Sequence, residues 1–317
     1  MQMQETVFRI LRFRLEHNEE QHFQTFRVQY NSQMSVLDAL ENIKHEQDSS
    51  LSFRRSCRSG ICGSCAMRIN HLAKLACKTK VKTEVDKHGE VVLEPLENMS
   101  PIRDLVADMT EFWHEVDRGT PWLQWDENLG NLNRENLLTD NQLQISSKLA
   151  DCIMCGACFS DCVSRVFDKN FTGPASLAKI RRFVGDPRDK VGERRVPALI
   201  EMGLWSCTHC YFCWSQCPRD VRPVAAISEL RELSFRSRDA SQGSRHVQAF
   251  TDSVKATGML NEIMLYLRTM RLKLIQDADV ILDMAIKGKA PSPLPRPIPR
   301  IDEVRAIYRL AKEAKNK

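Results

Sequence analysis

Hydrophobic and polar positions near the start of the chain alternate as they do in β-strands. Residues 6–14 and 23–30 are rich in aromatic and β-branched side chains and predict two strands. In residues 35–46 the apolar positions share one face after a Ser-x-x-Asp start, which predicts a capped helix. Shorter strands are expected near 66–70 and 90–95. This part of the chain therefore predicts a mixture of strands with a helix.

The pattern changes to a helical period from about residue 136. Pro174 and Pro223 stand where first-turn prolines belong, in front of apolar positions spaced as on a helix face. The helical period continues through 246–286 and predicts a long amphipathic segment. Residues 117–134 lie between the two patterns, are rich in turn formers and predict a connection against the surface.

The C-terminal segment combines proline with positive charge. Residues 291–300 hold five prolines, which exclude a helix, and a short helix is expected at 301–314. Residues 287–317 carry nine Lys and Arg against three acids, whereas the net charge of the whole chain is +5. A solvated or partner-wrapping tail suits this charge best, an anionic lipid surface comes next, and nucleic acid is not expected.

Length and composition suit a soluble chain of about two domains. The 317 residues are 42% hydrophobic and 27% charged, which is ordinary for a globular protein. No run of 18 apolar residues occurs, so no transmembrane helix is expected, and the N-terminus lacks the pattern of a signal peptide. Contact with a membrane is therefore expected mainly through a partner.

All twelve cysteines fall into three groups with the spacing of metal ligands. The first group is Cys57-x4-Cys62-x2-Cys65 followed by Cys77, the spacing of a plant-type [2Fe–2S] ferredoxin. The other two groups are C-x2-C-x2-C-x3-C runs, the spacing of bacterial two-cluster ferredoxins. The cysteines of these runs are Cys152, Cys155, Cys158 and Cys162, then Cys207, Cys210, Cys213 and Cys217.

Thiolates suit iron–sulfur clusters, zinc or copper(I), so the spacing has to decide between them. In the first group one loop presents three sulfurs, and Gly60 and Gly63 permit the positive φ angles that bring N–H groups near a cluster. Zinc sites usually pair two C-x2-C turns instead. A disulfide framework does not suit a chain of this length with clustered cysteines and no export pattern.

In a two-cluster run, the first three cysteines hold one cluster and the fourth ligates the other. Applied to this chain, the rule assigns a [4Fe–4S] cluster to Cys152, Cys155, Cys158 and Cys217. It assigns the third cluster to Cys162, Cys207, Cys210 and Cys213. Each cluster would join two segments of the chain, so this part is not expected to fold without metal.

These motifs turn the pattern of elements into a fold prediction. Residues 1–105 have the order of strands, helix and cysteine loop of a β-grasp [2Fe–2S] ferredoxin domain, of the α+β class. Residues 106–135 are predicted to connect it to an all-α, bacterial-ferredoxin-like domain with two cubane-type clusters at 136–240. Residues 241–317 are predicted to form an amphipathic, Pro-rich and basic extension, partly helical and partly extended.

Four segments around the cysteines are specific enough to compare with a known family. They are SCRSGICGSCAMRI (56–69) closed by LACKT (75–79), the cysteine run at 152–162, FTGPASLAKIRRFVGDPRD (171–189) and CPRDVRPVAAISELREL (217–233). These residues resemble the iron–sulfur subunit of succinate dehydrogenase and fumarate reductase. The resemblance covers about residues 1–240, and the tail runs beyond it.

The resemblance implies an electron-transfer subunit of a succinate:quinone oxidoreductase or quinol:fumarate reductase. Such a subunit relays electrons between a flavoprotein subunit carrying FAD and a membrane-associated, quinone-reactive subunit. This chain has no flavin-binding glycine fingerprint and no Arg and His set for a dicarboxylate, so no catalytic residue and no cofactor beyond the clusters is expected in it. The complex is expected at the cytoplasmic (inner) membrane, on its cytoplasmic face, or on the periplasmic face if a partner carries the chain across.

Two features depart from most of the family that the chain resembles. The position of Cys210 is usually not a cysteine and the third cluster is [3Fe–4S]; here a fourth thiolate predicts a second [4Fe–4S] cluster of lower potential. A [3Fe–4S] centre is expected if Cys210 is not a ligand. Val163 stands where many quinone-reactive members have proline, and a nearby Trp is missing. Both features resemble the subset with a cysteine-rich, heterodisulfide-reductase-like partner, which includes methylmenaquinol:fumarate reductases.

Three other functions fit parts of the pattern. A free-standing polyferredoxin should end near its last cluster, whereas this chain continues for a hundred residues after Cys217. An iron–sulfur subunit of another flavoenzyme, such as one acting on glycolate or glycerol-3-phosphate, does not account for the segments at 56–69 and 171–189. A zinc-based structural module does not fit the spacing of the first group.

Side chains beside the cysteines carry further expectations. His209 is expected to be a hydrogen-bonding neighbour of the third cluster. An apolar shell that keeps water from the clusters is expected from Trp205, Tyr211, Phe212 and Trp214, and contact with a partner is the alternative. Either a solvated basic rim or a docking surface for the flavoprotein is expected from Arg54, Arg55 and Arg58.

Overall fold

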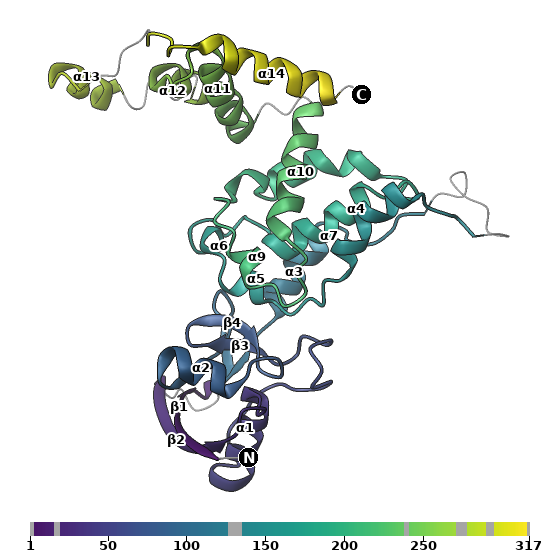
Figure 1. The fold of residues 1–317 in the computed structure, drawn as a ribbon, viewed down its shortest axis with the longest axis vertical. Coiled ribbons are helices and arrows are strands. Elements are labelled where there is room, and N and C mark those ends of the chain that lie inside the picture. Colours follow the sequence, from purple (N-terminus) through teal and green to yellow (C-terminus); the bar gives the residue numbers. More distant parts are fainter. Residues whose placement is uncertain are drawn as a thin grey trace. The chain divides into compact units, whose positions relative to one another are not determined.

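The computed structural model describes most of the chain. The described ranges are 3–15, 20–125, 135–237, 241–270, 278–289 and 295–315. The chain divides into two compact units, which we call the N-terminal unit (Met1–Leu233) and the C-terminal unit (Ser234–Lys317). Figure 1 shows the fold, with most of the longer helices and several strands labelled.

The N-terminal unit begins with a five-stranded mixed sheet in the order β2-β1-β5-β3-β4. Its strands are β1 (Gln4–Arg12), β2 (His22–Tyr30), β3 (Ala66–Ile69), β4 (Leu72–Leu75) and β5 (Val91–Glu94). β1 pairs antiparallel with β2 and parallel with β5, and β3 pairs antiparallel with β4 and β5. The four predicted strands are confirmed. The sequence analysis did not foresee β4 or the small pair β6 (Pro101–Arg103) and β7 (Val106–Ala107).

Alternation along the strands explains which face of this sheet is buried. In β1 every second residue is buried, Phe8 and Ile10 among them, and these side chains join the core that α1 (Val36–Asn42) completes. Ser35 caps this helix, since its side chain accepts from the Asp38 amide while the Asp38 carboxylate accepts from the Ser35 amide. The predicted capped helix is therefore confirmed.

Beyond the end of α1 two local features close the first domain. The chain continues past α1 as the π-helical turn η2 (Ile43–Gln47). A second helix, α2 (Val81–His88), which the sequence analysis did not foresee, ends at Gly89 in the left-handed conformation with φ 79°. Glycine adopts this conformation at no steric cost, which is why helices often end there.

Short helices make up the rest of the N-terminal unit. They are α3 (Thr110–Arg118), α4 (Asp140–Ala150), α5 (Ala157–Ser160), α6 (Val163–Phe167), α7 (Pro174–Val184), η4 (Gly192–Arg195), α8 (Val196–Glu201), η5 (Leu204–Ser206), α9 (Phe212–Ser215) and α10 (Pro223–Arg236). Helices α7 and α10 begin at Pro174 and Pro223, as predicted. Their apolar faces meet, with Leu177 and Ile180 in one core cluster with Ile227.

The segment expected to be a connection contains part of the core. Helix α3 lies inside residues 106–135, and its Phe112 is fully buried with its ring edge-on to Phe159, 5.5 Å between centroids. Composition missed this helix because turn formers dominate only the part after residue 117. Residues 126–134 lie outside the described ranges.

Arg195 fastens the end of this segment to the helices. Its guanidinium donates to the carbonyl oxygens of Thr120 (2.8 Å) and Trp122 (3.1 Å) and to the Asp189 carboxylate (2.7 Å). Both side chains of the Arg195–Asp189 pair are almost inaccessible to water. Asp189 also accepts from the Gln124 amide at 3.0 Å. One buried ion pair thus orders a stretch that lacks regular structure.

The C-terminal unit is helical but is not one long amphipathic segment. Its helices are α11 (Gln242–Thr257), α12 (Glu262–Met270), α13 (Ala278–Ile286) and α14 (Ile301–Lys315). The prediction of a continuous pattern through 246–286 was wrong, because α11 ends at Gly258 with φ 76°. A Cβ there would stand 2.3 Å from the Ile298 side chain. The final helix is confirmed, and 295–300 is not helical; 290–294 lies outside the described ranges.

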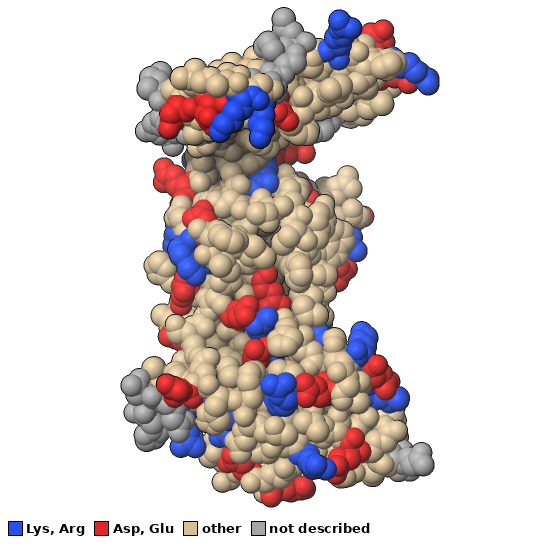
Figure 2. All heavy atoms as spheres, turned by 90° about the vertical axis from the view of Figure 1, so that its left-hand side faces the viewer, with Lys and Arg blue, Asp and Glu red and all other residues tan. Residues whose placement is uncertain are grey.

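The described helices and the surface in Figure 2 are of mixed charged and uncharged character. Among the described helices, none combines the length and the apolar character that crossing a bilayer requires. On the face drawn in Figure 2, basic and acidic side chains lie interspersed among larger uncharged areas. Neither sign of charge covers a continuous area of this face.

The Arg195–Asp189 pair predicts a loss of stability on mutation. We expect Arg195→Met to lower the free energy of unfolding by about 3–5 kcal/mol, because it leaves a buried carboxylate without its partner. The neighbouring Arg194 is exposed, and Arg194→Met should change stability by less than about 0.5 kcal/mol. Urea unfolding followed by circular dichroism measures both, and equal effects would contradict the assigned role.

The same pair predicts a pH dependence of stability. Burial by itself would raise the pKa of Asp189, but hydrogen bonds from Arg195 and from the Gln124 and Gly192 amides outweigh it and lower the pKa. A carboxyl whose pKa is lower in the folded state stabilises at neutral pH, and this contribution is lost as pH falls below about 4. Arg195→Met should therefore show a flatter loss of stability on acidification than the wild type.

Candidate metal centres

The first cysteine group lies in a loop whose backbone amides point at sulfur. The amides of Ser59 (3.4 Å), Ile61 (3.4 Å) and Cys62 (3.3 Å) donate to Cys57 Sγ, and the Cys57 amide lies 3.5 Å from Cys62 Sγ. The donors at Ser59, Cys62 and Ile61 lower the pKa of Cys57 to about 6. Gly60 and Gly63 have φ values of 71° and 74°, as the sequence predicted. The loop is thus built to stabilise thiolate sulfur.

A β-hairpin closes this first site. Cys65 immediately precedes β3, and Cys77 is the second residue after β4; Ala66 is paired with Leu75 across the hairpin. This pairing brings Cys65 and Cys77 into hydrogen-bond contact. Burial raises the pKa of Cys65 to about 12, so its proton leaves readily only when a metal takes its place. The strand that the sequence analysis missed is therefore the one that brings the fourth sulfur in.

The arginines beside this loop are largely engaged within the fold. Arg55 and Arg58 both pair with Glu41 at the end of α1, at 2.7 and 2.9 Å. Arg54 donates to the carbonyl oxygen of Ala107 at 2.8 Å. These contacts hold the loop on the domain, and they leave less charge for a partner than three free guanidinium groups would.

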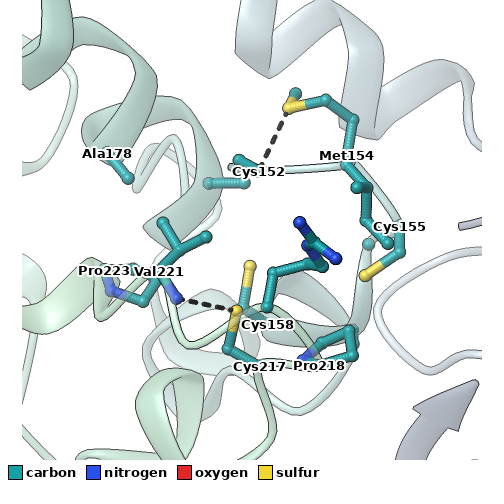
Figure 3. Close-up of a pocket in the computed structure, with 14 residues that line it drawn as sticks. Cys152, Met154, Cys155, Cys158, Ala178, Cys217, Pro218, Val221 and Pro223 are labelled. Carbon is teal, nitrogen blue, oxygen red and sulfur yellow. Dashed lines mark hydrogen bonds between the residues drawn. The ribbon is translucent and has the colours of Figure 1, made fainter. Parts of the chain in front are cut away.

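The second centre gathers cysteines from two distant segments. One pocket is lined by Cys152 and Cys155 from the loop that leads into α5, by Cys158 in α5, and by Cys217, which follows α9. Figure 3 shows these four residues around a common space, with the Val221 amide donating to Cys217 Sγ at 3.3 Å. The structure thus places Cys217 beside Cys152, Cys155 and Cys158, the three cysteines with which the spacing rule predicts that it shares a cluster.

Burial governs the acidity of this second group. It raises the pKa of Cys155 to about 11 and that of Cys158 well above the ordinary thiol value, and the neighbouring thiolates add to the effect. Taking a thiolate out of water is costly unless an opposite charge replaces the proton. Metal binding at this site must therefore release protons, and it couples to folding of the two segments.

The third group also assembles as predicted. Besides burial, the negative charges of Cys207 and Cys210 raise the pKa of Cys162, and those of Cys207, Cys162 and Cys210 raise the pKa of Cys213 to about 12. These four thiols therefore lie within electrostatic reach of one another. Cys210 is the most exposed of them. Whether each of the twelve cysteines ligates iron stays a prediction.

The chemistry of the donor set bears on the kind of metal that these three groups suit. Four thiols per group and amides directed at sulfur are the donor set that such clusters use. The residues present therefore fit iron–sulfur clusters.

The expected apolar shell around the third group is incomplete. The side chains of Tyr211 and Phe212 are exposed, at 55% and 42%, so the prediction that they exclude water was wrong for this chain by itself. Trp214 and Trp205 instead stack beneath the guanidinium groups of Arg222 and Arg231. The aromatic ring pattern thus leaves the Cys210 side of the third group open to solvent.

Hydrogen bonds around this group rest on His209 and Arg231. His209 lies 3.4 Å from the Ser228 hydroxyl, and burial followed by the charge of Arg231 lowers its pKa. Arg231 donates to the carbonyl oxygens of Leu204 (3.1 Å) and Cys207 (2.7 Å). The sequence analysis did not single out Arg231, although it lies one helical turn after Ile227, on the buried face of α10.

A second missed residue is Arg165, which is fully buried in α6 just after Cys162. Its guanidinium donates to the carbonyl oxygens of Lys169 and Phe171, at 2.7 and 2.6 Å, pairs with Glu111 and stacks on Phe159. It therefore fixes the backbone that carries Cys162. Nothing in the sequence indicates this burial, since an arginine is rarely buried without a network of acceptors.

One glycine joins the first centre to the second. A Cβ on Gly63 would lie 2.9 Å from Cys155 Cβ and 3.1 Å from the Ile153 carbonyl oxygen. Gly63 lies between Cys62 and Cys65, so the loop of the first group touches the backbone of a cysteine in the second. Only glycine allows this approach, because any side chain would push the loops apart.

Comparison with known families gives two matches. A 2Fe-2S iron-sulfur cluster binding domain matches residues 7–114, and a 4Fe-4S dicluster domain matches residues 148–221. The structure is similar to a chain of the Mycobacterium smegmatis Sdh1 complex in the apo form, with a TM-score of 0.67 and 24% identity, over 75% of this chain and 99% of that one. These matches confirm the predicted fold class, a [2Fe–2S] ferredoxin domain followed by a helical two-cluster domain.

Curated relatives extend the similarity beyond the fold. The fumarate reductase iron-sulfur subunit of Haemophilus influenzae is 36% identical over 231 residues, which span 69% of this chain and 89% of that protein. The mitochondrial succinate dehydrogenase (ubiquinone) iron-sulfur subunit 2 of Oryza sativa subsp. japonica is 37% identical over 201 residues, 62% of this chain and 64% of that protein.

The contact at Gly63 predicts that one methyl group can weaken the link between two centres. We expect Gly63→Ala to reduce or abolish the magnetic interaction between the first and second clusters in EPR spectra of the reduced protein. Gly89→Ala is the matched control, since Gly89 has φ 79° but nothing within 4 Å of the added Cβ. Both variants carry the same backbone penalty, so an equal change in both would refute the role of the contact.

Proposed function

Because this chain belongs to the family of iron–sulfur subunits of fumarate reductase and succinate dehydrogenase, we propose that it relays electrons between two other subunits of such a complex. One is a flavoprotein with FAD, which interconverts succinate and fumarate. The other is a membrane-associated subunit that reacts with quinone. The chain is part of an oxidoreductase and carries electrons rather than the dicarboxylate site.

The observation that carries this proposal is the gathering of all twelve cysteines into three neighbouring groups of four within the N-terminal unit. Iron–sulfur clusters supply reversible one-electron transfer when bound. The chain's own residues bind them and set their surroundings. Amides of the 57–62 loop stabilise thiolate charge, Gly63 lets the first two groups approach, and Arg165 and Arg231 hold the backbone at the third.

We further propose that the third centre is a [4Fe–4S] cluster held by Cys162, Cys207, Cys210 and Cys213. The support is that Cys210 lies close enough to Cys162 and Cys213 for its charge to raise the pKa of both thiols. A fourth thiolate adds negative charge to the centre. It should therefore lower the reduction potential relative to a three-thiolate [3Fe–4S] centre.

We propose that a cysteine-rich subunit of the heterodisulfide-reductase type exchanges electrons with this centre. Exposed apolar side chains beside the third group support a covering partner. Val163, Val166 and Phe167 on α6 are 44%, 58% and 85% exposed, and Tyr211 and Phe212 directly follow Cys210 in the sequence.

We also propose that the complex lies at the cytoplasmic membrane, on its cytoplasmic face, with membrane contact mainly through this partner. An exported partner would place it on the periplasmic face.

The first test is turnover by the complex purified through a tag on this chain. We expect a flavoprotein and a cysteine-rich subunit to co-purify, and we expect succinate-dependent dye reduction or fumarate-dependent oxidation of a reduced dye. Mass spectrometry identifies the subunits. Turnover with neither dicarboxylate would defeat the proposed function, and a monomer on size-exclusion chromatography would favour a free polyferredoxin.

The second test concerns Cys210. Air-oxidised, fully loaded wild-type protein should lack the near-isotropic EPR signal of a [3Fe–4S] centre, and Cys210→Ser should gain it, with the loss of one iron and a higher potential. Tyr211→Phe is the matched control, because it changes a neighbouring exposed residue that offers no sulfur. A strong [3Fe–4S] signal in the intact wild type would exclude Cys210 as a ligand.

A further inference from the structure

A groove in the C-terminal unit lies between α11 and α14, far along the sequence from the cysteines. It encloses about 500 Å³, which is in the range of small-ligand sites. Its lining residues are Asp252, Lys255, Ala256, Arg305, Tyr308, Arg309 and Lys312. Four of these seven are cationic, and the established family similarity does not account for any of them.

The spacing of the residues explains why the charges converge. Arg305, Arg309 and Lys312 follow the i, i+4, i+7 pattern and share one face of α14. Lys255 reaches the groove from α11. The two helices are held together there, since Arg305 donates to the Ala256 carbonyl oxygen at 2.9 Å and the Ile298 amide to that of Thr257 at 2.9 Å.

The groove lacks the acids that would neutralise its cations. Its single carboxylate, Asp252, already pairs with Arg268 at 2.6 Å, outside the groove lining. Arg305 pairs with Asp302 at 3.4 Å. Lys255, Arg309 and Lys312 form no ion pair with any residue in the described ranges, whereas Lys287 and Arg300 of the same unit each do.

Like charges on one helix face make this arrangement unfavourable without an anion, since Asp302 offsets only the charge of Arg305. Arg309 stands four residues after Arg305 and three before Lys312, and like charges at these spacings repel one another on a helix. α14 therefore keeps these repelling cations on one face, although glutamates occur at other positions of the same helix. A bound anion would turn the same three charges into attractive contacts.

We propose that this groove binds the phosphate group of an anionic ligand. A phosphate offers three oxygens and up to two negative charges, which match the planar donor fork of Arg309 and the ammonium groups of Lys255 and Lys312. A single-stranded nucleic acid would call for stacking aromatics, and Tyr308 is the single aromatic residue of the lining. The phosphate can belong to a soluble phosphorylated molecule or to a phospholipid headgroup.

Two binding measurements on the full chain distinguish these sources. Calorimetry with inorganic phosphate probes a soluble ligand, and co-sedimentation with phosphatidylglycerol vesicles, against phosphatidylcholine vesicles, probes a headgroup. The test variant combines Lys255→Gln, Arg309→Gln and Lys312→Gln. We expect it to weaken binding of the recognised probe at least about tenfold, the equivalent of one charge-assisted hydrogen bond.

The matched control removes three positive charges of the same unit outside the groove, Lys287→Gln, Lys289→Gln and Arg296→Gln. Saturable binding that the control keeps and the test variant loses supports the site, with phosphate or vesicles identifying the source. An equal loss of binding in both variants would show that the probe is attracted by the overall positive charge of the C-terminal unit and would overturn the site. The absence of saturable binding of either probe would also overturn it. The electron-transfer proposal is unaffected by either result, because the groove contains no cysteine.

Discussion

The fold depends on burying cysteine sulfurs where water cannot stabilise the negative charge of a thiolate. Burial raises the pKa of Cys155 to about 11 and that of Cys158 well above the ordinary thiol value, so these thiols stay protonated until metal replaces the proton. The sulfurs come from two segments about sixty residues apart, and α7 and α10 pack together to hold these segments. Assembly of the helical part and occupation of its metal sites are therefore one equilibrium rather than two.

The first centre stabilises thiolate charge at Cys57 by backbone amides rather than by waiting for metal at a buried site. Cys57 is not buried, and three backbone amides lower its pKa to about 6, so amide dipoles stabilise sulfur there. The loop keeps this geometry because Glu41 pairs with Arg55 and Arg58. The first site is thus preorganised by amides around a partly exposed cysteine, whereas the thiols of the second site are buried in the same unit.

Part of the fold followed from local sequence because local rules determine it. The capping box at Ser35 and the first-turn prolines at Pro174 and Pro223 were predictable, since each depends on residues within one helical turn. Strand β4 was missed because its four residues, Leu72–Leu75, include no β-branched or aromatic side chain that would mark a strand. The break at Gly258 was missed because periodicity counts apolar positions and does not weigh a glycine whose conformation is fixed by Ile298.

The sequence by itself determined which atoms can bind metal and how they are grouped, because ligand spacing is a property of the chain alone. Only the tertiary structure decided the contact of Gly63 with Cys155, the burial of Arg165 and the exposure of Tyr211. It also decided that Lys255 meets Arg309 across a groove. These features join residues far apart in sequence, whose proximity arises from packing of whole elements and is encoded in no local period.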